Sequence, residues 1–574
     1  MTMGPAGAST EVEQQFDAPD LEAVARWLAS QPAHAPVQIA TGRERVNIDT
    51  YFDTEDWAVY RARYTLRVRR VGDTAEATLK AFGTTEGNAR VRTEINQPLD
   101  SPDADVLLAG GPVTERLRLM LGTRRVLRPL FTAETQRRPF ALVRGGVTLA
   151  TLTLDDARIG SEAAGESLRR VEVEEDRPGA LAQAGSFIEA MQAACGLAPA
   201  TASKFESGLH ASALTPEAGS AFGETEASAD GPVDAYAYAV LRRVFAEFAR
   251  HESGTRLGED TEVLHQMRVA TRRLRAMLSS FAPALPEAMV RWRDEFRWVA
   301  AALGEVRDMD VQLETLHVLQ AGADWEHSTA VGPLIGIVDE SRVASRARLI
   351  DALDSDAFAM LVDGFGEALR TGPPPQASAT MPLAAREFGR LAIRRRYRRF
   401  RRDGVALTSE SPAVEYHAVR VRGKRLRYTL EPFVPVFRQA DALLAAVRGM
   451  QDLLGEHQDA EMAIARMRIL AQERGNALPP DTLLLMGELS ERWLVAMATA
   501  RAGWPRAFAR VRRCWREVRF VIPIPAPPRP PKAPSRPKTP RRARNAVTAS
   551  PAQRESLTPL TPLWRLYRRW RSRI

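Results

Sequence analysis

Apolar and polar residues alternate with a period of two along much of the first 210 residues. The clearest stretches are YTLRVRR (64–70), EATLK (76–80), RVRTEIN (90–96), VTLATLTLDD (147–156) and RRVEVEE (169–175). Alternation of this kind is typical of β-strands that present one apolar and one polar face. We therefore predict a domain of mostly strands, with a few helices, over residues 11–210, after a disordered N-terminus at 1–10.

A different pattern begins near residue 233 and continues to about 520. Apolar residues recur there at spacings of three and four, which predicts helices, and the strand alternation disappears. The segment 211–232 between the two regions is small, polar and without period, so we predict a linker. Residues 521–574 are rich in Pro and Arg, and we predict a disordered basic tail.

The polar faces of the predicted strands carry charges rather than neutral polar residues. Carboxylates form one group and Arg and Lys form another, each opposite an apolar face. A half-solvated sheet would explain any single strand of this kind. For the whole set we favour a barrel with a charged interior, because carboxylate oxygens bind Mg²⁺ or Mn²⁺ and Arg and Lys neutralise phosphate oxygens. The apolar faces would then pack against surrounding helices.

The order of these segments resembles the CYTH domain. Glu11-Val12-Glu13 is followed by LRVRR, ATLK, RTEIN, LDDARIG, VEVEE and SKFE. The resemblance covers residues 11–210 and implies an antiparallel barrel of about eight strands around a tunnel that holds Mg²⁺ or Mn²⁺. Members of this family hydrolyse inorganic triphosphate or thiamine triphosphate, or make cyclic AMP.

The resemblance also implies roles for individual residues of this chain. The implied catalytic residues are Glu11, Glu13, Lys80 and Glu94. The implied substrate-binding residues are Arg67, Arg69, Arg90, Arg92, Arg137 and Lys204. The implied metal-binding residues are Glu11, Glu13, Asp155, Glu172 and Glu174.

Two positions depart from the family pattern. Gln15 stands where the family's ExExK motif has Lys, and an amide can hydrogen-bond a phosphate oxygen without neutralising its charge. The loss of one interior cation would weaken triphosphate binding or turnover. Asn96 replaces a Glu of many relatives, although triphosphatases with a helical partner domain resemble this RxExN pattern. We therefore keep an alternative in which an impaired tunnel grips phosphate without cleaving it.

The helical region contains one cationic segment twice. HQMRVATRRLR begins at His265 and HAVRVRGKRLR at His417, and each is followed by a related LGE segment, which begins at Leu303 and Leu454. At about 100° per residue, four side chains of each copy fall within one arc of roughly 80°. The first arc is His265, Arg268, Arg272 and Arg275, and the second is His417, Arg420, Lys424 and Arg427. Two copies of matched length predict two similar helical bundles that face one another, over about 233–375 and 376–520.

These repeats resemble the CHAD domain, over about residues 233–520. That family binds inorganic polyphosphate in a basic channel, so the resemblance implies that both arcs bind the phosphate chain, with Arg273 and Arg425 at their edges. A solvated helix face is the alternative, but such faces usually mix charge signs and these arcs contain no acid. The run IRRRYRRFRR (393–402) either extends the channel or binds nucleic acid through interleaved aromatic residues; we favour phosphate contact.

Composition adds limits on location and partners. The chain has 574 residues and a formal charge of +9, but residues 521–574 hold thirteen Lys and Arg and one Glu, so the rest is slightly acidic. Cys195 and Cys514 form no metal-binding or disulfide pattern, which fits a reducing compartment. With no signal pattern and no apolar window of about 20 residues, we expect a cytoplasmic location, with polyphosphate granules as one candidate place. The oligomeric state is not indicated.

The patterns together predict an α+β multidomain protein: a CYTH barrel, a CHAD helical domain and a basic tail. The leading hypothesis is metal-dependent hydrolysis of inorganic triphosphate in the tunnel, with polyphosphate bound by the helices. The alternatives are a non-catalytic polyphosphate binder and, less favoured, a nucleic-acid binder that uses the tail and the 393–402 run. Cyclase activity and thiamine triphosphate as substrate stay open.

Overall fold

The computed structural model describes residues 7–32, 35–86, 88–101, 104–160, 165–216, 221–322, 325–374 and 382–518. The chain divides into two compact units, Met1–Asp324 with Leu334–Ala385, and Trp325–Pro333 with Arg386–Ile574. The predicted basic tail at 521–574 and the first six residues of the predicted N-terminal segment lie outside the described residues.

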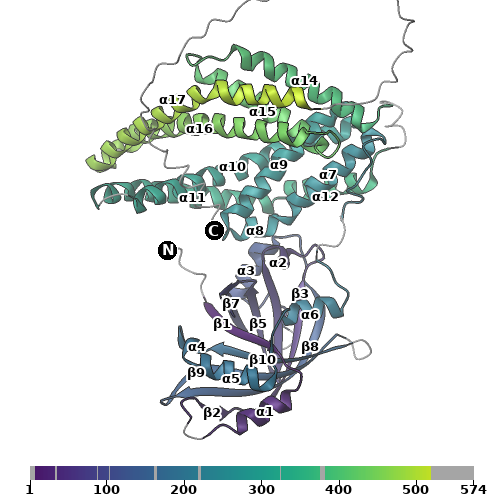
Figure 1. The fold of residues 1–574 in the computed structure, drawn as a ribbon, viewed down its shortest axis with the longest axis vertical. Coiled ribbons are helices and arrows are strands. Elements are labelled where there is room, and N and C mark those ends of the chain that lie inside the picture. Colours follow the sequence, from purple (N-terminus) through teal and green to yellow (C-terminus); the bar gives the residue numbers. More distant parts are fainter. Residues whose placement is uncertain are drawn as a thin grey trace, which may run out of the picture. The chain divides into compact units, whose positions relative to one another are not determined.

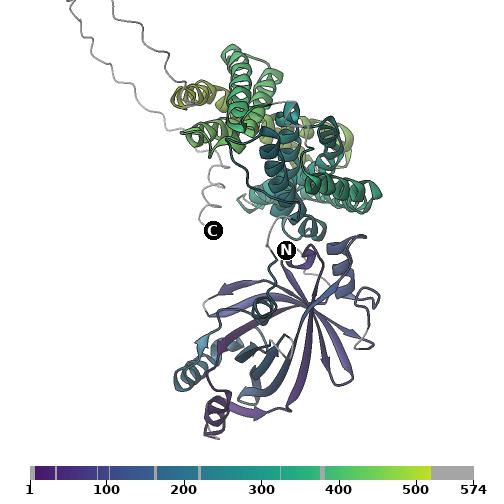
Figure 2. The same cartoon turned by 90° about the vertical axis from the view of Figure 1, so that its right-hand side faces the viewer.

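The first unit begins with a β-sheet that closes on itself (Figures 1 and 2). Its strands are β1 (Ala8–Asp17), β2 (Gln38–Thr41), β3 (Arg45–Asp53), β4 (Tyr64–Val71), β5 (Thr74–Ala81), β6 (Thr84–Glu86), β7 (Ala89–Leu99), β8 (Arg128–Arg144), β9 (Val147–Ile159), β10 (Glu166–Glu175) and β11 (Ala198–Pro199). Eight of them pair antiparallel in the ring β1-β10-β9-β8-β3-β4-β5-β7, and the ring closes where β7 pairs with β1. The predicted antiparallel eight-stranded barrel is confirmed.

Short helices cover the apolar outer face of the barrel. They are α1 (Leu21–Ala29), α2 (Ala58–Arg61), α3 (Pro112–Leu121), α4 (Ala180–Gln183) and α5 (Gly185–Cys195), whereas α6 (Lys204–Ala211) packs on interior residues. Val171 and Val173 of β10 and Leu152 and Leu154 of β9 are fully buried in one core with residues of α1, α4 and α5. Since successive residues of a strand point to opposite sides, the intervening charged residues must face the barrel interior.

Helix α6 closes part of the barrel interior. The interior side chains of Tyr51 and Phe131 pack with Phe205 of α6, and the rings of Tyr51 and Phe131 stack with centroids 4.8 Å apart. A capping box between Ser203 and Glu206 begins the helix and fixes the direction of its first turn. The residue at that turn, Lys204, therefore enters the interior rather than the solvent.

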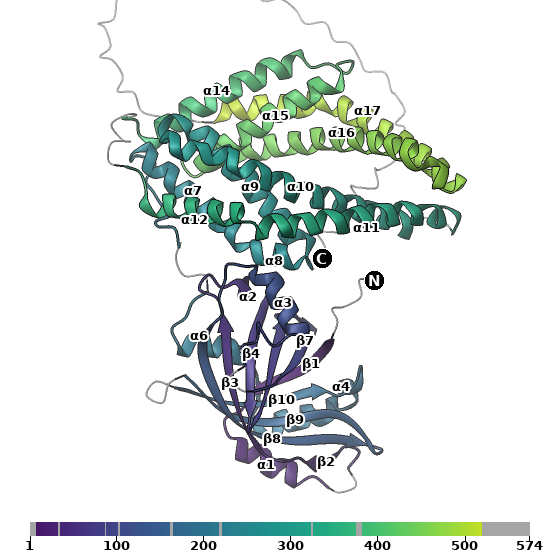
Figure 3. The ribbon, with the colours of Figure 1, turned by 180° about the vertical axis from the view of Figure 1, so that it is seen from behind.

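The remainder of the first unit is helical. Its helices are α7 (Val233–Arg250), α8 (Glu252–Leu257), α9 (Thr261–Phe281), α10 (Glu287–Ala321) and α12 (Asp356–Thr371), and α11 (Trp325–Asp354) belongs to both units. A 3₁₀ turn, Ala282–Ala284, joins α9 to α10. Asp260 caps the N-terminus of α9 by accepting a hydrogen bond from the backbone of Glu262. Helices α7, α9 and α10 pack side by side around buried aromatic residues such as Phe245 and Phe296 (Figures 1 and 3).

Apart from the first residues of α11, the described part of the second unit consists of four long helices. They are α14 (Ala385–Ala406), α15 (Ala413–Leu430), α16 (Ala440–Arg474) and α17 (Pro480–Glu517), with 3₁₀ turns at Glu431–Phe433 and Gly475–Ala477. Figure 3 shows them running alongside one another. Tyr397 of α14 stacks on Trp515 of α17, with ring centroids 3.7 Å apart. The prediction of a barrel followed by a helical region is confirmed.

Candidate functional site

Every strand of the ring places polar or charged side chains on the interior face of the barrel. The strand register puts the following on that face: Glu11, Glu13, Gln15, Asp17, Asn47, Asp49, Arg67, Arg69, Lys80, Arg90, Arg92, Glu94, Thr135, Arg137, Thr153, Asp155, Arg170, Glu172 and Glu174. All the tunnel residues predicted from the sequence are brought together in this interior, with Lys204 contributed by α6.

Ion pairs join the interior side chains of β1, β5 and β7. The Nζ of Lys80 lies 2.7 Å from a carboxylate oxygen of Glu11 and 2.7 Å from one of Glu94. The Nε of Arg92 lies 2.6 Å from Glu11, and Arg92 also pairs with Glu13. Arg90 is half-buried on the same face and forms no ion pair with any described residue.

A second group joins β8, β9, β10 and α6. The Nε of Arg137 donates to Asp155 at 2.8 Å, and the Nη2 of Arg137 lies 2.7 Å from Glu172. Lys204 lies 3.2 Å from Glu172 and also pairs with Asp155. Asp155 is fully buried, so in this structure its charge is balanced by two cations rather than open to a metal.

The interior also contains residues that were not predicted from the sequence, among them Asp17, Asp49 and Arg170. Asp49 of β3 is fully buried and accepts two hydrogen bonds from Arg69, at 2.7 and 2.8 Å. Burial opposes ionisation of Asp49, but Arg67 and Arg69 outweigh it and hold its pKa below the usual range. The alternation in RVNIDTYFD was the available signal, with Asn47 and Asp49 on one side.

Gln15 lies between two interior carboxylates. Its Nε2 donates to Glu13 at 2.9 Å and to Glu172 at 3.4 Å. The amide therefore makes the hydrogen bonds that a Lys at this position could make, but it leaves both carboxylate charges in place.

Two interior carboxylates, Glu13 and Glu174, have raised pKa values because they are buried near other carboxylates. Burial, together with the carboxylates of Glu11, Glu94 and Glu13, raises the pKa of Glu174 to about 7. Burial raises the pKa of Glu13 too, against the effect of Arg92. By contrast, Lys80 outweighs burial at Glu94 and lowers its pKa to about 2.

Several buried interior groups have no hydrogen-bond partner among the described residues. They are both amide atoms of Asn47, the hydroxyls of Thr135 and Thr153, and the Nε of Arg67. Buried polar atoms in proteins are almost always paired. The interior is therefore built for a polar occupant that supplies both donors and acceptors.

In the helical part of the first unit, the predicted arc on α9 forms a basic face. Leu274 is fully buried opposite it, as the helical spacing predicts. The Nδ1 of His265 and the Nε atoms of Arg272 and Arg275 are buried without a hydrogen-bond partner among described residues. Burial and the guanidinium of Arg307 lower the pKa of His265.

The arc is not wholly free of acids, because α10 supplies one. Arg268 lies 3.7 Å from Asp308. Near the end of the arc, burial and the guanidinium of Arg297 lower the pKa of Arg275. The sequence analysis did not assign a role to Arg307, which is almost fully buried on α10.

The second unit repeats this arrangement on α15 and α16. The Nδ1 of His417 lies 2.5 Å from the Oε1 of Gln458, the residue that matches Arg307 in the repeat. Because this hydrogen bond occupies Nδ1, the other ring nitrogen is left to meet a ligand. Arg427 lies 3.4 Å from Glu431 and over the ring of Tyr428.

The two copies share a contact between an arc arginine and a glycine. A β-carbon at Gly304 would lie 3.7 Å from the Nε of Arg268, and one at Gly455 would lie 3.8 Å from Arg420. Each guanidinium thus lies across the backbone of the LGE helix. Whether the two arcs face each other stays a prediction.

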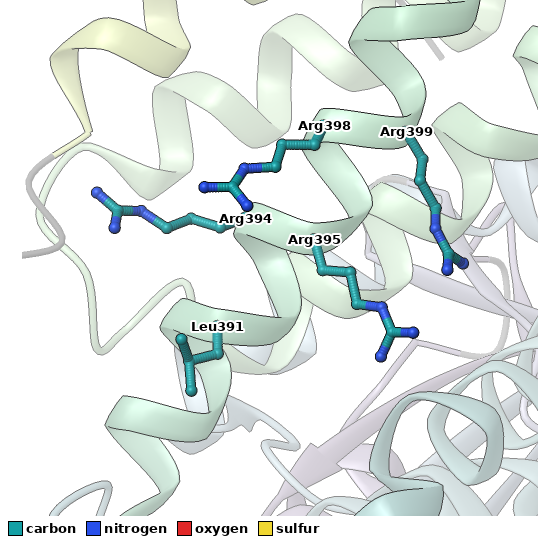
Figure 4. A pocket seen from close by; sticks show the side chains of 5 residues that line it. All are labelled: Leu391, Arg394, Arg395, Arg398 and Arg399. Atoms are coloured by element: carbon teal, nitrogen blue, oxygen red, sulfur yellow. The ribbon is translucent and has the colours of Figure 1, made fainter.

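Most arginines of the run at 393–402 lie on the exposed face of α14. A shallow pocket there is lined by Leu391, Arg394, Arg395, Arg398 and Arg399. The guanidinium groups of the four arginines point away from the helix (Figure 4). The interleaved aromatic residues point the other way: Tyr397 and Phe400 are buried against α17. They cannot stack on nucleic-acid bases, which removes the observation that favoured that interpretation.

Comparison with known families agrees with these two sites. A family model of the CYTH domain matches residues 30–208, and one of the CHAD domain matches residues 239–468. The chain is a CYTH–CHAD protein, with a CYTH domain followed by a CHAD domain. The CYTH family includes triphosphatases and adenylate cyclase-like enzymes.

Individual relatives are more distant. Two proteins described as uncharacterized, from Mycobacterium tuberculosis strains CDC 1551 / Oshkosh and H37Rv, are each 29% identical over 222 residues. The match covers 37% of this chain and 40% of each relative. The chain therefore spans less than half the length of these curated relatives.

Among solved structures, the CHAD domain of Ricinus communis is 24% identical and covers 50% of this chain and 96% of its own, with a TM-score of 0.42. PptA from Streptomyces chartreusis is 23% identical and covers 49% and 100%, with a TM-score of 0.39. HpAC1 from Hippeastrum, for which a dominant triphosphatase activity is described, is 18% identical and covers 36% and 99%, with a TM-score of 0.27. At these TM-scores none of the likenesses supports a statement about function.

CYTH tunnel enzymes use divalent metals. Over the described residues, no three His, Cys, Asp or Glu side chains meet in a group that could hold a metal ion. The donor chemistry nevertheless fits, because burial beside other carboxylates raises the pKa of Glu13 and Glu174, and a bound divalent cation would offset both effects. Over the same residues, no helix is both long and apolar enough to cross a membrane.

Proposed function

We propose that the barrel hydrolyses inorganic triphosphate, or a related triphosphorylated compound, and that the helical domain binds inorganic polyphosphate. The observation that carries the first part is the closed interior, where cations and carboxylates from different strands converge and several buried polar groups have no partner among the described residues. A short chain of phosphates with its metal supplies charges of both signs and many acceptor oxygens, which matches this set of groups.

The interior cations bind substrate by exchanging their carboxylate partners for phosphate oxygens. Arg69 and Arg137 each make a two-pronged contact with a carboxylate, and the same planar fork fits two oxygens of a phosphate group. Binding of triphosphate therefore releases carboxylates such as Glu172 from their cation partners. Those freed carboxylates, with Glu13 and Glu174, would hold Mg²⁺ or Mn²⁺.

The metal, when bound, supplies Lewis-acid stabilisation of the phosphate oxygens. Glu94 orients the attacking water. Lys80 keeps Glu94 ionised at neutral pH, so that this carboxylate accepts a hydrogen bond and is a weak base. Positioning of the water matters more than its deprotonation, because phosphoryl transfer passes through a loose transition state. Lys80 and Arg92, which lie beside Glu11, then neutralise the negative charge of the phosphate oxygens.

The test is phosphate release from inorganic triphosphate by the full chain with Mg²⁺ or Mn²⁺. The Glu11→Ala, Glu13→Ala double variant should lose activity by at least about a hundredfold, because it removes the acceptors of Arg92 and Lys80. Glu134→Gln, an exposed residue on the outer face of β8, is the matched control and should be unchanged. Wild-type release no greater than that of the double variant would leave the non-catalytic alternative in place. Thiamine triphosphate and ATP in the same panel define the substrate.

The polyphosphate proposal rests on the arc of α9. Arg272 and Arg275 each have a buried Nε without a hydrogen-bond partner among the described residues, and the like-charged Arg297 of α10 lies near Arg275. An extended anion relieves both the missing hydrogen bonds and the repulsion. Competition separates this function from nucleic-acid binding: long-chain polyphosphate should displace DNA at physiological salt, and efficient displacement of polyphosphate by DNA would support the rival.

A further inference from the structure

One interior cation plays no part in the proposed mechanism so far. Arg170 of β10 is one of two arginines that are fully buried among the described residues, with 1% of its surface exposed. It lies opposite Asp17 on β1 and opposite Asp155 on β9. Directly paired residues point to the same side of a sheet, so Arg170 lies on the interior face with Asp155 and Glu172.

The contacts of Arg170 hold one end of its guanidinium firmly and the other loosely. Its Nε and Nη2 both donate to a single oxygen of Asp17, at 3.3 and 2.8 Å. Its Nη1 reaches the Oε1 of Gln15 at 3.5 Å, the limit of a hydrogen bond. Asp17 thus orients the side chain, and the Nη1 end is the part that can be given up to a ligand.

Gln15 joins this cation to the carboxylates of the tunnel. Its carbonyl oxygen faces Arg170, and its amide nitrogen donates to Glu13 and Glu172. A Lys at position 15, as in the family motif, would place a second positive charge beside the buried guanidinium. Like charges in a buried setting repel strongly, so the neutral amide and the arginine suit each other.

We propose that Arg170 supplies the interior cation that Gln15 lacks, and that its Nη1 binds a phosphate oxygen of the tunnel substrate. This inference rests on the proposed triphosphatase function and assigns the charge that the motif substitution removes. With Arg137 and Lys204, which share Asp155 and Glu172, Arg170 forms a group of three cations at one end of the substrate.

The test is a four-member cycle in the full chain: wild type, Arg170→Gln, Gln15→Lys and the double variant. Triphosphate binding is measured by calorimetry with and without Mn²⁺, and KM and kcat by phosphate release. Arg170→Gln should weaken triphosphate binding about tenfold, as expected for one lost charge-assisted hydrogen bond. Gln15→Lys alone should bring no gain, because the two cations repel. The double variant should recover binding to within about threefold of wild type, since Lys then replaces the lost charge.

Two further variants separate ligand binding from a purely structural role. Arg170→Lys keeps the charge and should keep most of the affinity. Arg138→Gln, on the outer face of β8 where it pairs with Glu22, is the control and should bind as wild type. Thermal melting of each variant identifies those that are destabilised, and affinities are compared only for folded protein.

The outcomes are distinct. Two results would overturn the role of Arg170 and leave the triphosphatase proposal intact. One is unchanged triphosphate affinity in folded Arg170→Gln. The other is a gain in affinity for Gln15→Lys alone, with the two substitutions acting independently. Wild-type protein that neither binds nor hydrolyses triphosphate would overturn the proposed function and this inference with it.

Discussion

At the scale of single residues, the tunnel shows one side chain type in opposite electrostatic states. Glu94 beside Lys80 has a pKa lowered to about 2, whereas Glu174, among Glu11, Glu94 and Glu13, has a pKa raised to about 7. The first carboxylate is bound by a fixed cation and the second is left to attract a mobile one. This difference agrees with the roles we propose, in which Glu94 orients water and Glu174 helps to hold the metal.

The raised pKa of Glu174 predicts a pH effect on stability in metal-free protein. An ordinary Glu ionises near 4.3 when unfolded, so the folded state binds the proton more tightly, and stability falls as pH rises from about 4.5 through 7. Glu174→Gln should therefore be more stable than wild type at pH 8 by about 1 kcal/mol and equal to it at pH 4.5. The figure is reduced for solvent screening, because part of the Glu174 side chain is exposed although its carboxylate is desolvated.

Urea unfolding with a chelator at the two pH values measures this difference, and Glu134→Gln is the control for loss of a surface charge. A Glu174→Gln variant with the same stability as wild type at both pH values would show that the carboxylates do not repel. Added Mn²⁺ should stabilise wild type more than the variant.

At the scale of elements, the repeated helices explain the duplicated sequence. In each copy a histidine, an arginine and a glycine of the following LGE helix lie together: His265, Arg268 and Gly304, then His417, Arg420 and Gly455. The residue at the matching position of each LGE helix interacts with the leading histidine. It is Arg307 in the first copy and Gln458 in the second. The two basic faces are therefore related but not equivalent.

The basic face of α9 gives a binding prediction. Arg272→Gln combined with Arg275→Gln should weaken polyphosphate binding roughly tenfold or more, about 1.4 kcal/mol, and should make it less sensitive to salt. Arg291→Gln, an exposed α10 residue paired with Glu287, is the control. Fluorescence anisotropy with labelled polyphosphate at several salt concentrations measures both quantities. Equal affinities and equal salt slopes would identify the arc as a solvated face.

The helix α6 gives a packing prediction. A β-carbon at Gly208 would overlap the ring of Phe131, so Gly208→Ala should destabilise the barrel by about 1–3 kcal/mol and displace Lys204 from Asp155. Gly185→Ala at the start of α5 is the matched control, because nothing lies within 4 Å of its added carbon. The melting temperature and the KM for triphosphate should both change in Gly208→Ala, and neither should change in Gly185→Ala.

At the scale of the whole molecule, the two phosphate sites that we propose lie on different domains. Substitutions at sites that share no partners act independently. The Arg272→Gln, Arg275→Gln variant should therefore keep the triphosphate turnover of wild type, and the Glu11→Ala, Glu13→Ala variant should keep its polyphosphate affinity. Loss of turnover in the α9 variant would mean that the tunnel depends on an occupied helical domain.

The sequence was sufficient to place most tunnel residues on one face, but not to pair them. Alternation put Glu172, Glu174 and also Arg170 on the same side of RRVEVEE, yet the importance of Arg170 depends on its contacts with Asp17 and Gln15, more than 150 positions away along the chain. Asp49 was overlooked because the polar face of its strand includes Tyr51, which weakens the alternation. In the 393–402 run the aromatic residues turned out to be core, since they recur at helical spacing on the face opposite the arginines.

The sequence by itself determined the direction of each side chain: inward or outward on a strand, along the arc or behind it on a helix. That follows from local backbone geometry, which repeats every two residues in a strand and every 3.6 in a helix. Only the tertiary structure decided which charges meet, which carboxylates keep a raised pKa and which buried groups have no partner. Those properties depend on strand register and burial, and both are set by segments that are distant in the sequence.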